Sequence, residues 1–152
     1  MKTLIVGLGN PMLGDDGVGW KIAEIINRQL PPDGSIIVDR LSSGGISLMQ
    51  HFIGYDRVIL IDAFASEAEI GSVHIMKLKE IPGYSAFHVS SQHDISLQKA
   101  IGIGKSIGAD LPEDITVVGI STPCIHDFCS ELSSPVVEAI PLATQAVLDL
   151  LK

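Results

Sequence analysis

The chain has 152 residues, of which 46% are hydrophobic and 18% are charged. This length and apolar content exclude a disordered chain and predict one self-sufficient domain over residues 1–152. The formal net charge of −8 would repel a phosphate backbone, and no run of Lys or Arg offsets that repulsion. Nucleic acid is therefore excluded as an expected partner.

The sequence shows no sign of export or of a membrane span. The first apolar run breaks into Gly, Asn, Pro and two Asp, which is wrong for a signal peptide. No segment approaches the roughly 18 uninterrupted apolar residues that a span needs. The two cysteines, Cys124 and Cys129, are too few to staple a domain, which fits a reducing compartment. We therefore expect a cytoplasmic monomer.

The N-terminal part predicts a strand followed by a helix. Residues 3–8 form a short apolar run that stops at Gly-Leu-Gly-Asn-Pro, which is typical of a buried parallel strand ending at a turn. Apolar residues then recur at helical spacing from Val18 and predict a helix that ends near Leu30. Asp15 and Asp16 are placed to cap the N-terminus of this helix.

The second and third strands are predicted at residues 35–39 and 57–63, on either side of a helical stretch at residues 46–52. This alternation predicts an α/β fold in which helices cover both faces of a parallel sheet. A fourth strand at residues 72–78 follows the third after only about eight residues, whereas a parallel crossover needs a dozen or more. We therefore predict that the fourth strand runs antiparallel.

The rest of the chain is predicted to form, in order, a long loop, a helix, a fifth strand, a second long loop and a last helix, at residues 80–92, 94–107, 115–120, 121–133 and 134–151. The first loop carries His93 to the start of its helix. Ser134 and Pro135 form a suitable N-cap and first residue for the last helix, whose apolar face should include Val137.

Three polar side chains are predicted to reach the edge where the parallel strands end, and in open α/β sheets ligands bind there. Asp16 follows the first strand, Asp62 ends the third, and the loop after the antiparallel strand carries His93 back over the sheet. Two carboxylates and one imidazole make a partial coordination shell for a divalent metal. Taken singly, each residue also has a simpler explanation, as a helix-terminus charge, a strand-end cap and a polar loop residue.

The segment GLGNPMLGDDGVG closely resembles the N-terminal signature of the hydrogenase maturation protease family. The residues that carry this likeness are Gly7, Gly9, Asn10, Gly14, Asp15, Asp16, Gly17 and Gly19. VILIDA at 58–63 is similar to the family's strand that ends in the second metal-binding Asp, and SSQH at 90–93 is similar to its His segment. VVGI followed by SSPVVEAI resembles the C-terminal part, so the likeness spans nearly the whole chain.

The resemblance implies a three-layer α/β/α fold with a mixed five-stranded sheet whose fourth strand is antiparallel. It also implies an endopeptidase that removes a C-terminal extension from the precursor of a nickel hydrogenase large subunit. The catalytic and metal-binding residues would be Asp16, Asp62 and His93, which would recognise nickel already installed in that precursor. The substrate would supply the nickel, and the isolated site would accept Ni, Zn or Cd.

Four residues are candidates for substrate binding: Asn10, Asp39, Gly44 and Gly45. Asn10 and the glycines of the N-terminal signature should chiefly shape the backbone. Asp39 and the turn at residues 42–45 are predicted at the carboxyl edge, where a peptide could be held, with an ordinary connecting loop as the alternative.

The segment CIHDFC brings together Cys124, His126, Asp127 and Cys129. These residues could add a metal ligand or a redox-sensitive lip to the site. A pair of cysteines at C-x4-C spacing is a weak signal by itself, and ordinary loop residues are the favoured explanation.

The sequence contains no Ser/His/Asp set and no HExxH motif that would define the attack on a peptide bond. One hypothesis is a metal-polarised carbonyl attacked by water, with Asp16 or Asp62 as the base. Two other functions stay open. A nucleotide-binding domain is suggested by the Gly-rich turn and Asp39, although Met12 stands where the dinucleotide motif requires Gly. A non-catalytic nickel-binding maturation chaperone would use the same three ligands.

Overall fold

The structure of the chain is a computed structural model that describes residues 1–65, 68–84, 95–123 and 131–152. Five strands form one sheet in the order β2-β1-β3-β5-β4. Their bounds are β1 Thr3–Leu8, β2 Ile36–Leu41, β3 Arg57–Ala65, β4 Val73–Lys77 and β5 Asp114–Thr122. The pairs β1–β2, β1–β3 and β3–β5 are parallel, whereas β4 pairs antiparallel with β5. The predicted mixed topology is confirmed.

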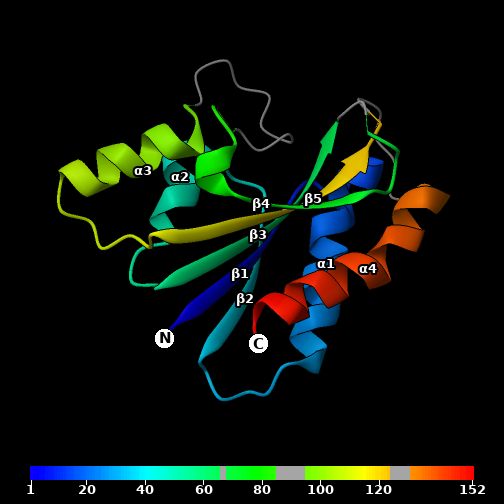
Figure 1. Ribbon diagram of the computed structural model, residues 1–152, viewed down its shortest axis with the longest axis horizontal. Coiled ribbons are helices and arrows are strands. Elements are labelled where there is room, and N and C mark those ends of the chain that lie inside the picture. The colour runs from blue at the N-terminus through cyan, green and yellow to red at the C-terminus, as the bar shows by residue number, and fades with distance from the viewer. Residues whose placement is uncertain (66–67, 85–94, 124–130) are drawn as a thin grey trace.

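Helices cover both faces of the sheet, which gives the predicted three-layer arrangement (Figure 1). They are α1 Val18–Gln29, α2 Gly45–Gln50, α3 Leu97–Ser106 and α4 Ser134–Leu150, with two short 3₁₀ helices, η1 Gly14–Gly17 and η2 Leu78–Glu80. One core lies between the sheet and the pair α1 and α4, and the other lies between the sheet and the pair α2 and α3. None of the helices in the described residues is long and apolar enough to cross a membrane.

β2, β3 and β5 extend further than predicted, and in β2 and β3 this changes where two candidate residues lie. β2 continues to Leu41, so Asp39 lies inside the strand, opposite Val6 of β1. β3 continues past Asp62, which pairs with Gly119 of β5. The prediction that these acids end their strands is wrong, because pairing with the neighbouring strand continues beyond each of them.

Two helices also differ in detail from the prediction. α3 begins later than predicted, at Leu97, because the side chain of Ser96 caps it by accepting a hydrogen bond of 3.2 Å from the Lys99 N–H. α4 begins at Ser134 as predicted, but Ser133 is its N-cap. Val137 was predicted on the buried face and is 48% exposed. The buried face instead uses small residues that allow close packing: Val136, Ala139, Ala143, Thr144 and Val147.

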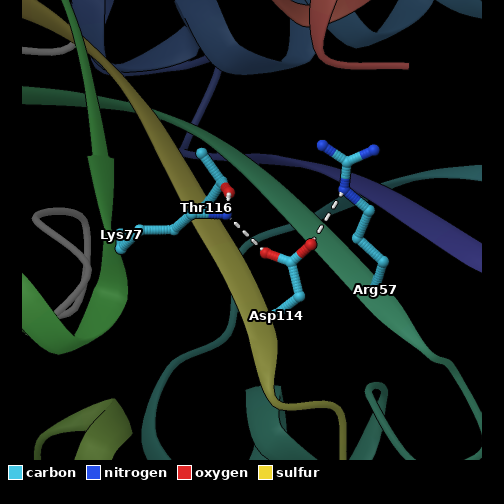
Figure 2. Close-up of polar contacts among 4 residues, drawn as sticks. All are labelled: Arg57, Lys77, Asp114 and Thr116. Carbon is cyan, nitrogen blue, oxygen red and sulfur yellow. Dashed lines mark hydrogen bonds and ion pairs between the residues drawn. The ribbon is translucent and has the colours of Figure 1, made fainter. Parts of the chain in front are cut away.

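The amino end of the sheet is held by a cluster of charges around Asp114 (Figure 2). Asp114 Oδ1 accepts a hydrogen bond of 2.6 Å from Lys77 Nζ, and Asp114 Oδ2 lies 3.3 Å from Arg57 Nε. Lys77 Nζ also donates to Thr116 Oγ1 at 3.1 Å. The cluster therefore ties β3, β4 and β5 together at the end of the sheet opposite to the candidate site.

Candidate functional site

Asp62 is the buried carboxylate at the carboxyl edge of the sheet. It follows Ile61, which pairs with Gly7 near the end of β1, so it lies level with the loop that leaves β1. Asp62 is only 2% exposed. Since burying a carboxylate is costly without hydrogen bonds, the surroundings must supply them.

Tyr84 supplies one of these hydrogen bonds, a role that was not predicted from the sequence. Its Oη donates to Asp62 Oδ2 at 2.6 Å. Burial, the charge of Asp62, this hydrogen bond and the charge of Asp16 hold the pKa of Tyr84 well above its usual range. The phenol therefore stays protonated at neutral pH. The negative charges of Asp62 and Asp16 both contribute to raising the pKa of this hydroxyl. The only sequence signal was an aromatic residue with a polar tip in a predicted functional loop.

Asp16 lies half-buried in η1, and the backbone of its own loop holds its carboxylate. The Asn10 N–H donates to Asp16 Oδ2 at 2.8 Å. Gly9 allows this approach, because its φ is +147° and an added Cβ would lie 2.0 Å from the Asp16 carbonyl oxygen. The Asn10 side chain accepts a hydrogen bond of 3.0 Å from the Met12 N–H. Asn10 thus shapes the loop, and its contact with substrate stays a prediction.

Asp15 has a different role from the helix cap that was predicted. The helix α1 has Gly17 as its N-cap, without a side-chain cap. Asp15 is 1% exposed, and its two carboxylate oxygens accept hydrogen bonds from Ser133, at 2.6 Å from the backbone nitrogen and at 2.8 Å from Oγ. Asp15 therefore joins the loop after β1 to the start of α4.

The third predicted ligand, His93, lies outside the described residues, as do Cys124, His126, Asp127 and Cys129. The described residues on either side of residues 85–94 are tied together, because the Leu97 N–H donates to the Tyr84 carbonyl oxygen at 2.9 Å. The chain thus leaves for His93 and returns from it beside the Asp62–Tyr84 pair. In the described part of the chain, no group of three or more His, Cys, Asp or Glu side chains could hold a metal ion.

The other candidate substrate residues fall in two places. Gly44 precedes α2 and Gly45 begins it, with φ +54° at Gly45, where an added Cβ would lie 3.3 Å from the Ile95 carbonyl oxygen. This turn therefore packs against the chain that returns from His93. Asp39 is exposed inside β2, and its charge adds to burial in raising the pKa of Tyr55. Asp39 lies further from the carboxyl edge than predicted, and its role in substrate binding stays a prediction.

A hollow of about 240 Å³ opens beside the Asp62–Tyr84 pair. A larger hollow of about 400 Å³ lies at the amino end of the sheet, where Lys77, Gln98 and Asp114 line it. We assign the smaller hollow to the functional site, because it contains the buried carboxylate and lies where the parallel strands end.

The donor chemistry of the described site suits a divalent cation. Carboxylate oxygens are ligands for such ions, and ligating carboxylates are themselves oriented by hydrogen bonds from a second layer of groups. The Asn10 N–H does this for Asp16, and the Tyr84 hydroxyl does it for Asp62.

The fold and this site define an α/β/α domain with an acidic centre at the carboxyl edge of its sheet. Residues 20–150 match the model of the hydrogenase maturation protease family. The chain therefore belongs to that family and is an endopeptidase, a peptide-bond hydrolase. This conclusion confirms the resemblance seen in the sequence and replaces the alternatives of a nucleotide-binding domain and a non-catalytic chaperone.

Individual relatives agree with the family assignment. The chain is 28% identical over 151 residues to the hydrogenase expression/formation protein HoxM of Azotobacter vinelandii, covering 99% of this chain and 72% of that protein. It is 28% identical over 122 residues to the hydrogenase 2 maturation protease of Escherichia coli, covering 79% and 73% of the two chains. The fold is similar to that of the hydrogenase maturating endopeptidase HybD from E. coli, with a TM-score of 0.77, 24% identity and coverage of 99% and 92%.

Proposed function

We propose that the chain removes a C-terminal extension from the nickel-loaded precursor of a hydrogenase large subunit, and that Asp16, Asp62 and His93 recognise the nickel. One observation supports this more than any other: Asp62 is buried at the carboxyl edge, and the Tyr84 hydroxyl donates a hydrogen bond of 2.6 Å to its Oδ2. His93 enters the proposal from the sequence. A relative named hydrogenase 2 maturation protease supports a hydrogenase precursor as the substrate.

The physical basis of the proposal is a site that is incomplete without its substrate. Two carboxylates and one imidazole leave coordination positions for groups of the precursor that already hold the ion. Binding then depends on whether nickel is installed, because an empty precursor lacks the contact. Specificity is thereby coupled to the assembly of the hydrogenase metal centre.

Hydrolysis adds water across the peptide bond. In the proposed reaction, water attacks the amide carbonyl, which is polarised by the precursor's nickel, and the leaving nitrogen takes up a proton. Asp16 or Asp62 accepts the proton of the attacking water. Tyr84 keeps its own proton and orients Asp62, because burial and the neighbouring charges raise the pKa of the phenol.

The direct test compares two forms of one precursor, with and without nickel, incubated with the protein and analysed by intact-mass spectrometry. We expect a short C-terminal peptide to be lost from the nickel-loaded form alone. An uncut nickel-loaded precursor would contradict the proposed substrate. Equal cleavage of both forms would contradict recognition of nickel.

Variants of the two carboxylates and the imidazole test the roles of these groups in the same assay. Asp16→Asn, Asp62→Asn and His93→Ala should each abolish processing and weaken binding of Ni, Zn or Cd measured by titration calorimetry. Asp33→Asn is the matched control, because Asp33 is exposed in the connection between α1 and β2. Melting curves check that each variant is folded. Normal processing by a variant would show that the substituted residue is not part of the site.

A further inference from the structure

The hollow of about 400 Å³ at the amino end of the sheet lies at the opposite end from the acidic centre. Its apolar wall is formed by Leu78, Ile101, Pro112 and Ile115. Its charged lining consists of Lys77, Lys79, Lys105, Glu113 and Asp114. We call this space the amino-end hollow. Small-molecule sites in proteins commonly have a volume of this order and an apolar wall.

We propose that the amino-end hollow binds a small aliphatic carboxylate that carries a single negative charge. The site is separate from the acidic centre, and the inference does not depend on the proposed function. A carboxylate could also come from an acidic side chain of a partner protein, and one arm of the test separates these two sources.

The charges around the hollow select a monoanion. The whole chain has 18 Asp and Glu residues against 10 Lys and Arg residues. Around the hollow this balance is reversed, because three lysines face two acids. Lys79 is exposed, and it forms no ion pair within the part of the chain that the structure describes. One negative charge therefore balances the hollow, whereas a more highly charged anion would be repelled by Glu113 and Asp114.

A carboxylate can reach cations here without disturbing the sheet. Lys105 Nζ donates to Glu113 Oε1 at 2.8 Å, and the Glu113 side chain is 89% exposed. Such an exposed ion pair contributes little to stability, so Lys105 can turn to a ligand at low cost. Lys77 stays in place, because it ties β4 to β5 through Asp114 (Figure 2). The ligand would thus be held by Lys105 and by Lys79.

The apolar wall selects an aliphatic body for the ligand. Leu78, Ile101 and Ile115 are each at most 8% exposed, and an alkyl chain gains free energy as its surface leaves water. None of the described residues that line the hollow is aromatic, so a nucleobase would find no ring to stack on. The volume equals roughly thirteen times the share of one water molecule in the liquid, which is room for about ten non-hydrogen atoms.

Gln98 fixes one wall of the hollow before any ligand binds. Its Nε2 donates to the carbonyl oxygens of Leu78 and Ile81, which joins α3 to η2. Because only the amide nitrogen can donate, these contacts also fix the place of Gln98 Oε1. This oxygen is buried and accepts no hydrogen bond from the described residues. Buried acceptors normally have a partner, so the described residues alone do not complete the polar contacts of this wall.

The first arm of the test compares three probes of equal length by NMR titration of the wild-type protein: octanoate, octanamide and octylamine. At low ionic strength, which screens charges least, octanoate should bind with a Kd below about 1 mM. It should bind at least 10-fold more tightly than the other two probes. From butanoate to octanoate, the Kd should fall about two- to fourfold for each methylene that enters the hollow.

The second arm changes the charges around the hollow. Lys79→Met and Lys105→Met should each weaken octanoate binding at least fivefold, and melting curves check that the variants are folded. Lys99→Met is the matched control, because Lys99 is exposed on α3 like Lys105 but does not line the hollow. Asp62→Asn should leave octanoate binding unchanged, because Asp62 lines the smaller hollow at the other end of the sheet.

The third arm separates a free acid from an acidic side chain of a partner protein. The probe N-acetyl-Leu-Glu-Leu-amide presents a carboxylate and aliphatic groups on a peptide. It should bind at least 10-fold more weakly than octanoate, because the apolar wall leaves the polar groups of a peptide backbone without hydrogen bonds. Tighter binding of the peptide would overturn the free acid as the ligand.

Three further results would overturn the inference. No binding of octanoate at about 10 mM would show that the hollow is not a site for this class of ligand. Equal binding of octanoate and octylamine would show that the lysines do not select a negative charge. Weaker binding in Asp62→Asn, with the Lys79 and Lys105 variants unchanged, would place octanoate in the smaller hollow beside the acidic centre.

Discussion

Replacing Tyr84 by Phe removes one oxygen atom from the site and keeps the ring. The lost atom donates the 2.6 Å hydrogen bond to Asp62 Oδ2, and water cannot readily replace it because Asp62 is 2% exposed. A hydrogen bond to a charged group typically contributes about 1.5–3 kcal/mol. We expect the free energy of unfolding at neutral pH to fall by about this amount in Tyr84→Phe.

The same substitution should slow processing, since Asp62 loses the group that orients it. Removing such a supporting hydrogen bond typically costs about 10–100-fold in metal affinity or activity. We expect kcat/KM for the nickel-loaded precursor to fall within that range. Tyr55→Phe is the control, because Tyr55 lies next to Lys2, whose Nζ is 4.8 Å from the ring centroid, and outside the acidic site. Wild-type kcat/KM with unchanged stability in Tyr84→Phe would refute the orienting role.

The stability of the wild-type protein at alkaline pH provides an independent measurement. The pKa of Tyr84 in the folded protein is raised, first by burial and then by the charge of Asp62. In the unfolded chain the Tyr84 hydroxyl ionises near pH 10, so above that pH it has released a proton that it still holds in the folded protein. The contribution to stability is therefore complete below about pH 10 and is lost as the pH rises toward the folded pKa. Urea midpoints should fall more steeply with pH in the wild type than in Tyr84→Phe, and parallel curves would contradict this assignment.

Three further tests of the scaffold use four variants. Gly19→Ala places a Cβ 2.4 Å from a carbonyl oxygen of β3 and should lower the free energy of unfolding by roughly 3 kcal/mol, measured by urea denaturation. The Cβ of Gly102→Ala in α3 meets nothing within 4 Å, so this variant should raise the free energy of unfolding by up to about 1 kcal/mol. Ser133→Ala removes the 2.8 Å hydrogen bond to the buried carboxylate of Asp15 and should cost about 1.5–3 kcal/mol in the same experiment. Asp114→Asn weakens ion pairs of a carboxylate that is 43% exposed, so it should cost no more than about 1 kcal/mol and leave processing unchanged.

Each of these three has an outcome that would count against its reasoning. Equal stability of Gly19→Ala and Gly102→Ala would mean that α1 does not need its close approach to the sheet. A neutral Ser133→Ala would mean that Asp15 is held by other contacts. A large loss of processing in Asp114→Asn would connect the amino end of the sheet to the site, and the residues that the structure describes offer no such connection.

The sheet was predictable because its physical causes are local. The strands β1, β3 and β5 are buried on both faces, so each is a nearly continuous apolar run in the sequence. The direction of β4 followed from the short connection that precedes it. The ends of β2 and β3 were not predictable in this way, because pairing with a neighbouring strand carries them past Asp39 and Asp62.

Two of the contacts that build the site have no local cause. Asp15 and Ser133 are 118 residues apart, and the side chains of Asp62 and Tyr84 are 22 residues apart across a turn of the chain and a strand. Neither pair leaves a periodic pattern in the sequence. The sequence could predict that Asp62 reaches the carboxyl edge, but it could not predict which residue would donate a hydrogen bond to it there.

The neighbouring acids Asp15 and Asp16 show why an acidic motif does not define a set of ligands. Both lie in η1, and successive residues of a 3₁₀ helix point about 120° apart, so their carboxylates cannot serve one centre. Asp15 is turned inward, is 1% exposed and holds Ser133, whereas Asp16 is half-buried and its charge reaches Tyr84. One acid therefore joins the loop to α4, and the other is held within the loop by the Asn10 N–H. Substituting Asp15 should reduce stability, and processing should fall only as a consequence. Substituting Asp16 should reduce processing with little loss of stability.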